Sequence, residues 1–151
     1  MTRPTLQVRP LVATDRPAWE PLWKAYQDFY QVDLGPVVTD TTWGRFLDPA
    51  EPMFARGAFA GDRLVGIVHY IFHRSGWMVG PTCYLQDLYT EADQRGAGVG
   101  RALIEAVYEQ AALAGAGRVY WLTHESNVAG RQLYDRIATN SGFIQYRKQI
   151  G

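Results

Sequence analysis

Between residues 94 and 101 the chain reads Gln94-Arg95-Gly96-Ala97-Gly98-Val99-Gly100-Arg101. Glycines at alternate positions stand here between a β-rich run and an amphipathic helical pattern. Glycine lets backbone N–H groups turn toward one point, and the N-terminus of the following helix adds the positive end of a dipole. The pattern therefore predicts a loop whose amides hold a phosphate group.

The spacing of these glycines excludes two other phosphate loops. A Walker loop requires Gly-Lys-Ser/Thr, whereas Gly100 is followed by Arg101 and Ala102. A dinucleotide-binding fingerprint requires a further glycine at position 101, which is arginine here. Taken alone, the segment is also compatible with a plain glycine-rich turn.

The segments around the loop are assigned from the period of their apolar side chains. The expected strands are 6–9, 57–60, 64–72, 83–90, 119–123 and 142–146, with a hairpin turn at 61–63. The expected helices are one capped by Asp15 with Pro17 in its first turn, then 39–47, one from about Val99 to Gly115, and 128–138. This mixed order predicts an α+β fold with a largely antiparallel central sheet.

Composition narrows the class of protein. The chain has 151 residues, 47% of them hydrophobic, with 15 basic and 15 acidic side chains. We expect one soluble, cytoplasmic domain over residues 1–151, and the balanced charge argues against a nucleic-acid partner. No apolar run approaches the about 18 residues of a membrane span. The lone Cys83 and the lack of a Cys/His cluster predict neither a disulfide nor a bound metal.

The two halves of the chain differ in charge. Residues 1–93 carry eight basic and eleven acidic side chains, net −3, and residues 94–151 carry seven basic and four acidic ones, net +3. Scatter explains so small an imbalance. The alternative is that the C-terminal half binds a polyanion and the N-terminal half a cation.

The glycine loop is accompanied by a second motif. Arg95-x-x-Gly98-x-Gly100, after the strand at 85–90, resembles the pyrophosphate-binding motif of the GNAT superfamily, the acetyl-CoA-dependent N-acetyltransferases. Further on, the segments that look like the second CoA-contacting helix of that superfamily and the strand after it are Asn127, Ala129, Leu133-Tyr134 and Gly142-Phe143. The similarity covers about residues 83–146, and Tyr84 to Tyr89 look nearest to diamine and histone/polyamine acetyltransferases. The resemblance implies a GNAT-type sheet with helices on both faces.

The resemblance also implies how acetyl-CoA, the cosubstrate, is held. Backbone groups of Leu88, Tyr89 and Thr90 would lie along the pantetheine arm like an added strand. The pyrophosphate would be held by residues Arg95, Gly96, Ala97, Gly98, Val99, Gly100 and Arg101. Asn127 and Arg131 would bind the cofactor from the second helix, and Tyr134 would donate a proton to the thiol that leaves.

The resemblance leaves the general base open. Close diamine acetyltransferase relatives have glutamate where this chain has Gln86, and an amide cannot accept a proton. Asp87 is the nearest carboxylate, although regular strand alternation points it away from the side of position 86. His69, His73, His124 and a water chain are the other candidates, and isolated histidines are more often structural.

The acceptor is expected to be a primary amine, either a small polyamine-like molecule or a basic protein tail. Residues 15–51 contain seven acids and three bases, which suits a cation but also a solvated acidic face. The aromatic stripe of the first helix is expected to pack in the core, with Tyr30 and Trp43 as the side chains that contact the acceptor. The alternative is a non-catalytic acyl-CoA-binding or regulatory module, which Gln86 would favour.

A homodimer is also expected. Only residues 142–151 remain for strands after the last helix, enough for one strand where many relatives have two. This leaves an unprotected sheet edge that a second subunit could cover.

Overall fold

The computed structural model describes residues 5–151, which divide into two compact units between Trp121 and Leu122. The first unit holds a five-stranded sheet in the order β1-β2-β3-β4-β5. Its strands are β1 Leu6–Pro10, β2 Met53–Ala60, β3 Arg63–His73, β4 Thr82–Thr90 and β5 Val119–Tyr120. Strands β1 to β4 are antiparallel neighbours, and β5 alone runs parallel to its partner β4. The expected α+β fold with a largely antiparallel sheet is confirmed.

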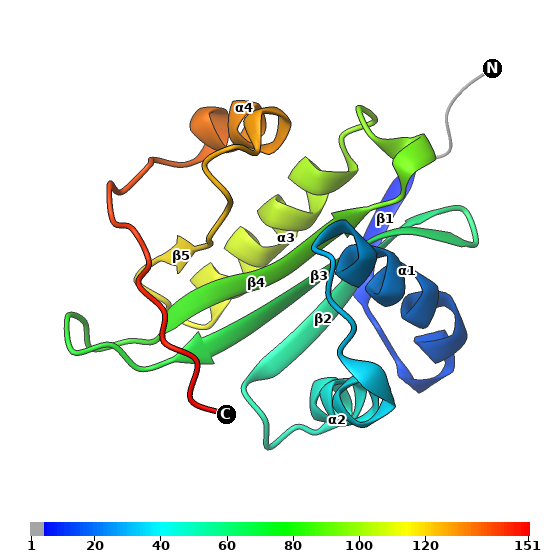
Figure 1. Ribbon diagram of the computed structural model, residues 1–151, viewed down its shortest axis with the longest axis horizontal. Coiled ribbons are helices and arrows are strands. Elements are labelled where there is room, and N and C mark those ends of the chain that lie inside the picture. Colours follow the sequence, from blue (N-terminus) through cyan, green and yellow to red (C-terminus); the bar gives the residue numbers. More distant parts are fainter. Residues whose placement is uncertain (1–4) are drawn as a thin grey trace. The chain divides into compact units, whose positions relative to one another are not determined.

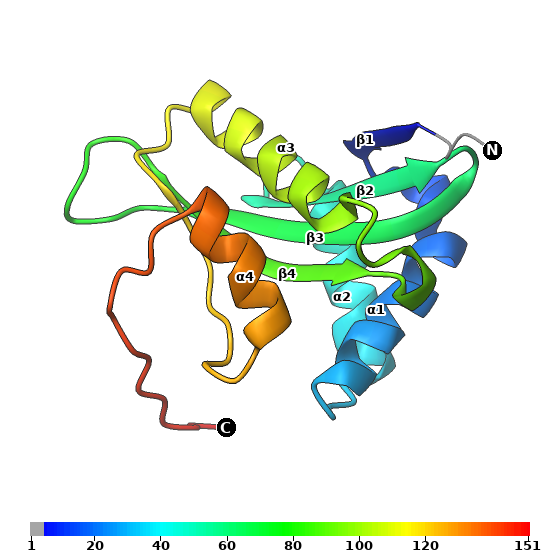
Figure 2. The same cartoon turned by 90° about the horizontal axis from the view of Figure 1, so that it is seen from above.

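Helices cover both faces of this sheet (Figure 1 and Figure 2). The helices of the first unit are α1 Arg16–Phe29, α2 Gly35–Leu47 and α3 Val99–Leu113, with short 3-10 turns η1 Ala13–Asp15 and η2 Ala92–Gln94. Figure 2 shows α3 on one face and α1 and α2 on the other. Helix α2 begins earlier than position 39, because Pro36 fits the first helical turn, where its missing N–H costs no hydrogen bond.

The core on the α1 face is aromatic. Trp19 is completely buried, and its ring centroid lies 4.7 Å from that of Trp43 and 5.8 Å from that of Trp23. The buried residues of this cluster are Leu11, Trp19, Leu22, Trp23, Trp43, Ala55, Phe59, Leu64 and Ile67. The expectation that the stripe of the first helix packs in the core is confirmed for both of its tryptophans.

On the opposite face α3 packs closely against β3. A Cβ added at Gly66 would lie 2.6 Å from Cγ1 of Val99 and 3.0 Å from Cδ1 of Leu103, so only glycine allows this approach. Because Val99 is also the first residue of α3, this contact fixes where the helix begins and therefore where the glycine loop ends.

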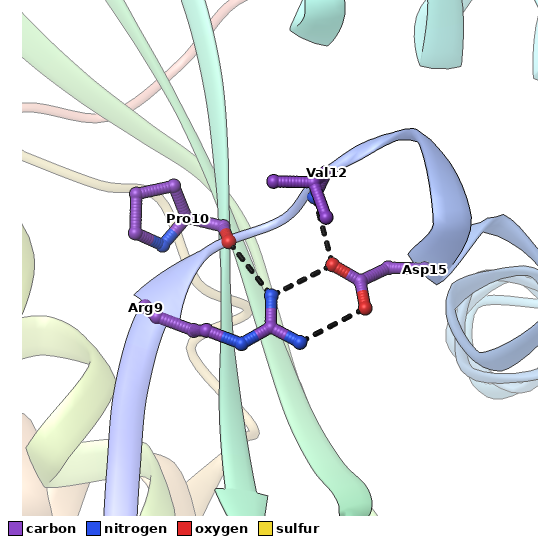
Figure 3. A network of polar contacts seen from close by, with 4 residues as sticks. All are labelled: Arg9, Pro10, Val12 and Asp15. Atoms are coloured by element: carbon purple, nitrogen blue, oxygen red, sulfur yellow. Dashed lines mark hydrogen bonds and ion pairs between the residues drawn. The ribbon is translucent and has the colours of Figure 1, made fainter.

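Asp15 is the N-cap residue of α1, as expected, and its side chain joins the end of β1 to the start of that helix. Its carboxylate accepts hydrogen bonds from Arg9 Nη1 at 2.8 Å, from Arg9 Nη2 at 3.0 Å and from the backbone N–H of Val12 at 2.7 Å (Figure 3). The side chain makes no capping hydrogen bond to α1. Asp15 therefore stands at the expected N-cap position, but its carboxylate is occupied by the Arg9 guanidinium and the Val12 amide and caps no amide of α1.

A bulge interrupts the pairing of β3 with β4. His69 is opposite Asp87, but Tyr70 is opposite Leu85, so Gln86 is an extra residue in β4. Paired residues share a face, and His69 and Tyr70 are consecutive on β3, so they face opposite sides. Asp87 therefore lies on the face of His69, and Leu85 on the other. Regular alternation, which would put Leu85 and Asp87 on the same face, is therefore broken at Gln86.

The second unit, residues 122–151, contains α4 Val128–Ile137. The expected strand at 142–146 is absent: residues 139–151 form neither helix nor strand. A strand forms only where a partner backbone pairs with it, and apolar residues such as Phe143 and Ile144 do not supply one. The expected strand at 119–123 is likewise reduced to β5, since pairing with β4 stops after Tyr120.

Candidate functional site

The predicted phosphate loop has the backbone that its glycines suggest. It follows η2 and ends where α3 begins, and Gly96 and Gly98 both have φ of +83°. A Cβ built on either residue meets no atom within 4 Å, so open space adjoins both. The first amides of α3, those of Val99, Gly100 and Arg101, have no acceptor within the helix. Gly100 differs from the other two, since it lies in the first helical turn without a positive φ.

The two arginines of the loop have local partners. Arg95 Nε donates to the carbonyl oxygen of Thr90 at 3.3 Å, and its guanidinium carbon lies 5.6 Å from the centroid of the Tyr89 ring. Arg101 Nε donates to Glu105 Oε1 at 2.8 Å, one turn along α3. Arg95 therefore stays beside the end of β4, and an anion must compete with Glu105 for Arg101.

One edge of β4 carries no strand beyond its first residues. Strand β5 pairs with β4 only at Cys83 and Tyr84. Within residues 5–151 no further strand pairs with that edge, which includes Leu88, Tyr89 and Thr90. A ligand with amide groups can therefore hydrogen-bond there as an added strand would. This edge leads toward the glycine loop, and together they fit an extended ligand that ends in a pyrophosphate.

Asp87 lies at the centre of a polar group on the α1 face. His69 Nδ1 is 2.9 Å from Asp87 Oδ2, and the Nε1–H of Trp19 donates to His69 Nε2 at 3.0 Å. The Asp87 side chain retains 12% exposure, whereas the His69 side chain retains 1%. Tyr26 also hydrogen-bonds to Asp87. The carboxylate is thus fixed on one side by buried groups and open to solvent on another.

Two tyrosines, Tyr26 on α1 and Tyr30 just after that helix, lie near this carboxylate. Burial, together with the charge of Asp87, raises the pKa of Tyr26 and also that of Tyr30. Both hydroxyls therefore stay protonated at neutral pH. Tyr30 is 37% exposed and its ring centroid lies 5.0 Å from that of Tyr26, so it is placed where an acceptor could reach it. Trp43 is only 6% exposed and packs in the core. The expected contact of Trp43 with the acceptor is therefore not proposed.

The remaining histidines and the cysteine lie elsewhere. His73 Nε2 is 2.7 Å from the hydroxyl of Tyr120, and His73 Nδ1 is 2.7 Å from the carbonyl oxygen of Arg74. His124 is exposed and belongs to the second unit. Cys83 is fully buried, and burial raises the pKa of its thiol to about 11, so it is not an activated nucleophile.

The second unit carries the other predicted cofactor residues on α4 or at its start. Asn127 caps the helix, because its Oδ1 accepts from the Gly130 amide at 3.2 Å while its Nδ2 donates to Thr123 Oγ1 at 3.0 Å. Arg131 Nη1 donates to the carbonyl oxygen of Glu125 at 2.8 Å. Tyr134 is half-buried, about two helical turns after Asn127.

Residues 5–151 are the part of the chain that the structure describes. No set of three or more His, Cys, Asp or Glu side chains is arranged to hold a metal ion in this part of the chain. Nor does the described chain contain a helix with the length and apolar character needed to span a bilayer.

The sequence profile of the Acetyltransferase (GNAT) family matches residues 17–138. The chain belongs to this family. It is 36% identical over 151 residues to the D-amino-acid N-acetyltransferase HPA3 of Saccharomyces cerevisiae, covering 98% of this chain and 93% of that protein. Membership of the GNAT family confirms the expected acetyl-CoA-dependent N-acetyltransferase.

Solved GNAT structures share the fold. A ribosomal-protein-alanine N-acetyltransferase from Brucella melitensis biovar Abortus 2308 has a TM-score of 0.82 at 21% identity, covering 97% of this chain and all (100%) of that one. An aminoglycoside N-acetyltransferase, AAC(6')-Iy in complex with CoA, has a TM-score of 0.72 at 19% identity, covering 95% and 100%. At such identities the likeness shows the fold alone.

Sequence reasoning placed the loop and Asp87 but not the surroundings of Asp87. The sequence places Tyr26 in the aromatic stripe of the first helix, which is expected to pack in the core. It offers His69 only as one of several isolated histidines. The signal that could have joined them is the connection between β3 and β4: counting back from the loop at 74–81 places His69 opposite Asp87 only if the bulge is known.

Proposed function

We propose that this GNAT enzyme acetylates the primary amine of a small amino compound, with Asp87 as the group that accepts the proton of the amine. The observation that carries the proposal is the position of Asp87. A carboxylate held by His69 and Tyr26, yet partly exposed, stands on the same strand as the unpaired edge near Leu88 to Thr90. A proton acceptor therefore adjoins the place that fits the pantetheine arm.

The cosubstrate site is the glycine loop with the edge of β4. Amides from Arg95 through Arg101 would hold the pyrophosphate, and the space beside Gly96 and Gly98 leaves room for it. Backbone groups of Leu88, Tyr89 and Thr90 would bind the pantetheine amides. The resemblance to GNAT enzymes would also assign Asn127 and Arg131 to binding of the cosubstrate. Bound acetyl-CoA would supply the acetyl group as a thioester.

Three proton transfers accompany the acetyl transfer, two from the amine nitrogen and one to the sulfur. An alkyl amine with a pKa near ~10 is mostly protonated at pH 7, so it must lose a proton before it can attack. Asp87 would take that proton, directly or through water, while Tyr30 lines the approach. Tyr134 would give a proton to the sulfur that leaves, because a tyrosine hydroxyl is protonated at neutral pH without activation. The nitrogen would lose its second proton as the amide forms, and this proton would restore Tyr134 directly or through water.

For the acceptor we favour an amino acid, and a D-amino acid first, because the yeast relative with that activity aligns over 98% of this chain. The acidic side chains at 15–51 support a polycationic acceptor less than their number suggests, because several of them already pair with arginines of the same chain. Asp15 pairs with Arg9, and Asp40 and Glu20 both pair with Arg16. A small polyamine-like amine is the second candidate, supported by the carboxylate and tyrosines at Asp87, and a basic protein tail is the third.

The experiment is acceptor-dependent release of free CoA thiol. The panel contains a D-amino acid and its L-enantiomer, spermidine and a lysine-rich peptide, each at the same concentration. We expect turnover with the D-amino acid that exceeds turnover with its enantiomer. If turnover were faster with spermidine or the peptide, that compound would represent the acceptor class in place of the D-amino acid. CoA binding without turnover above hydrolysis for any amine would favour a non-catalytic acyl-CoA-binding module.

We also propose a cytoplasmic homodimer. The support is that β1 and β5 are the two edges of the sheet, and that β5 is only two residues long. Light scattering after size exclusion would give about twice the 17.0 kDa chain mass for a dimer. A mass of one chain at micromolar concentration would contradict the dimer.

A further inference from the structure

Trp19, His69 and Asp87 form a buried chain of hydrogen bonds across three elements. The indole Nε1–H of Trp19 on α1 meets His69 Nε2 on β3 at 3.0 Å, and His69 Nδ1 meets Asp87 Oδ2 on β4 at 2.9 Å. An indole nitrogen is a donor only. His69 Nε2 must therefore accept, so it carries no proton, and the proton of the neutral ring is on Nδ1, directed at Asp87.

We infer, resting on the proposed role of Asp87, that His69 is a positioning residue for the general base and not itself the base. Its Nε2 is occupied by Trp19, so it has no lone pair to offer an amine. Its Nδ1–H donates to Asp87 Oδ2, and the carboxylate remains partly exposed to solvent. The histidine thus holds the carboxylate in place and favours its ionised form.

The surroundings of His69 keep the ring in this one state. Its side chain is 1% exposed, and its ring centroid lies 4.4 Å from that of Phe46 and 5.2 Å from that of Trp23. Neither neighbour can take a proton, and a second proton on the ring would remove the acceptor that the Trp19 N–H needs. Burying the resulting charge without a partner at Nε2 would also be costly.

The titratable groups around Asp87 come from three elements. His69 on β3 donates to it, Tyr26 on α1 and Tyr30 just after α1 face it, and Tyr84 on β4 lies near Tyr26. Tyr26 and Tyr30 stay protonated at neutral pH, because burial and the charge of Asp87 raise the pKa of each. Loss of the His69 donor therefore leaves Asp87 with fewer hydrogen bonds to its ionised form, and protonation of the carboxylate becomes easier.

The first test is the protonation state of His69 by ¹⁵N NMR of the resting enzyme, with its signals assigned by their loss in His69→Gln. We expect protonated Nδ1 and unprotonated Nε2 at pH 7, because Nε2 accepts from the Trp19 indole. Trp19→Phe removes the donor at Nε2, so a proton on that nitrogen should be found more readily in this variant than in the unmodified enzyme. A charged ring or an Nε2–H tautomer in the unmodified enzyme would overturn the inference.

The second test is the pH profile of kcat/KM. His69→Leu should move the acid limb upward by about one pH unit and lower kcat/KM about tenfold at pH 7. His69→Asn places an amide N–H near the position of Nδ1, so it should restore much of the profile. His73→Leu, on the same strand, is the matched control and should leave the limb in place.

The outcomes separate this inference from the proposed function. If Asp87→Asn is slow but His69→Leu keeps the unmodified acid limb, Asp87 is the base and the positioning role of His69 is refuted. If Asp87→Asn is as fast as the unmodified enzyme, the proposed base itself fails. Should His69→Leu fail to fold, the tautomer measurement and Trp19→Phe still decide the matter.

Discussion

Leu85 and Asp87 of β4 face opposite sides of the sheet although they are two residues apart, because Gln86 between them is a bulge. The bulge brings Asp87 under α1, where it meets His69 and Tyr26. Without it, alternation would direct the carboxylate toward the α3 face with Leu85. A single extra residue in the strand thus determines which side of the sheet has the proton acceptor.

Replacing Asp87 by asparagine tests this assignment. Asp87→Asn keeps the shape but cannot take a proton, so kcat/KM should fall ~10²- to 10⁴-fold while CoA affinity stays unchanged. The rate comes from thiol release and the affinity from calorimetry. Gln86→Ala, at the exposed neighbouring position, is the control and should retain most of the activity. An Asp87→Asn enzyme with the unmodified rate and pH profile would point to a water chain.

Much of the fold follows from local patterns in the sequence. The spacing of Leu103, Ile104 and Val107 predicts α3, and all three side chains are buried where that helix meets the sheet. The hairpin is equally local, since its turn needs the positive φ of +61° that Gly61 provides. Patterns within one segment are enough for such elements.

Features that depend on distant partners did not follow from the sequence. The bulge at Gln86 is defined by the pairing of β4 with β3, so the residues next to Gln86 in the sequence do not predict it. Trp43 and Tyr30 are both aromatic residues in or just after a helix. Trp43 is buried because it packs against Trp19, and the sequence alone does not reveal that contact. Residues 142–146 alternate like a strand but have no partner in the described sheet.

Gly98→Val should abolish CoA binding. Gly98 has φ of +83°, which costs a branched residue about 1–3 kcal/mol, and the new side chain would fill the space proposed for the pyrophosphate. Calorimetry measures the affinity. Gly115→Val is a matched control, because Gly115 also has a positive φ (+74°) with open space beside it, but at the other end of α3.

Comparing these two variants separates the effect of backbone strain from the effect of filling the space proposed for the pyrophosphate. Gly115→Val should lose stability in urea and keep CoA affinity, whereas Gly98→Val should lose both. Gly100→Val should also weaken CoA, but through its side chain alone, since Gly100 has no positive φ to strain. Folded Gly98→Val protein with unchanged CoA affinity would refute the loop assignment.

Tyr134→Phe tests the proposed acid. The ring is preserved, so folding and acetyl-CoA affinity should stay nearly intact, while turnover falls ~10²- to 10⁴-fold because no proton reaches the leaving sulfur. Turnover is measured where chemistry limits the rate. Tyr146→Phe, in the same unit and 90% exposed, is the control. A Tyr134→Phe enzyme with at least about a third of normal turnover would exclude Tyr134 as the essential acid.

Asp15→Asn should destabilise the first unit in a pH-dependent way. The hydrogen bonds from Arg9 lower the pKa of Asp15 more than burial raises it, and the Val12 amide adds to the effect. A carboxyl with a lowered pKa stabilises the fold fully above its unfolded pKa of about 3.9, and this contribution is lost as the pH falls through the lower folded value. Urea unfolding should therefore show a cost of about 2 kcal/mol at pH 7 that shrinks below pH ~3.9. Asp40→Asn, whose exposed side chain pairs with Arg16, should cost less than about 1 kcal/mol. Equal urea midpoints for Asp15→Asn and the unmodified chain at pH 7 would mean that this ion pair does not stabilise the junction of β1 and α1.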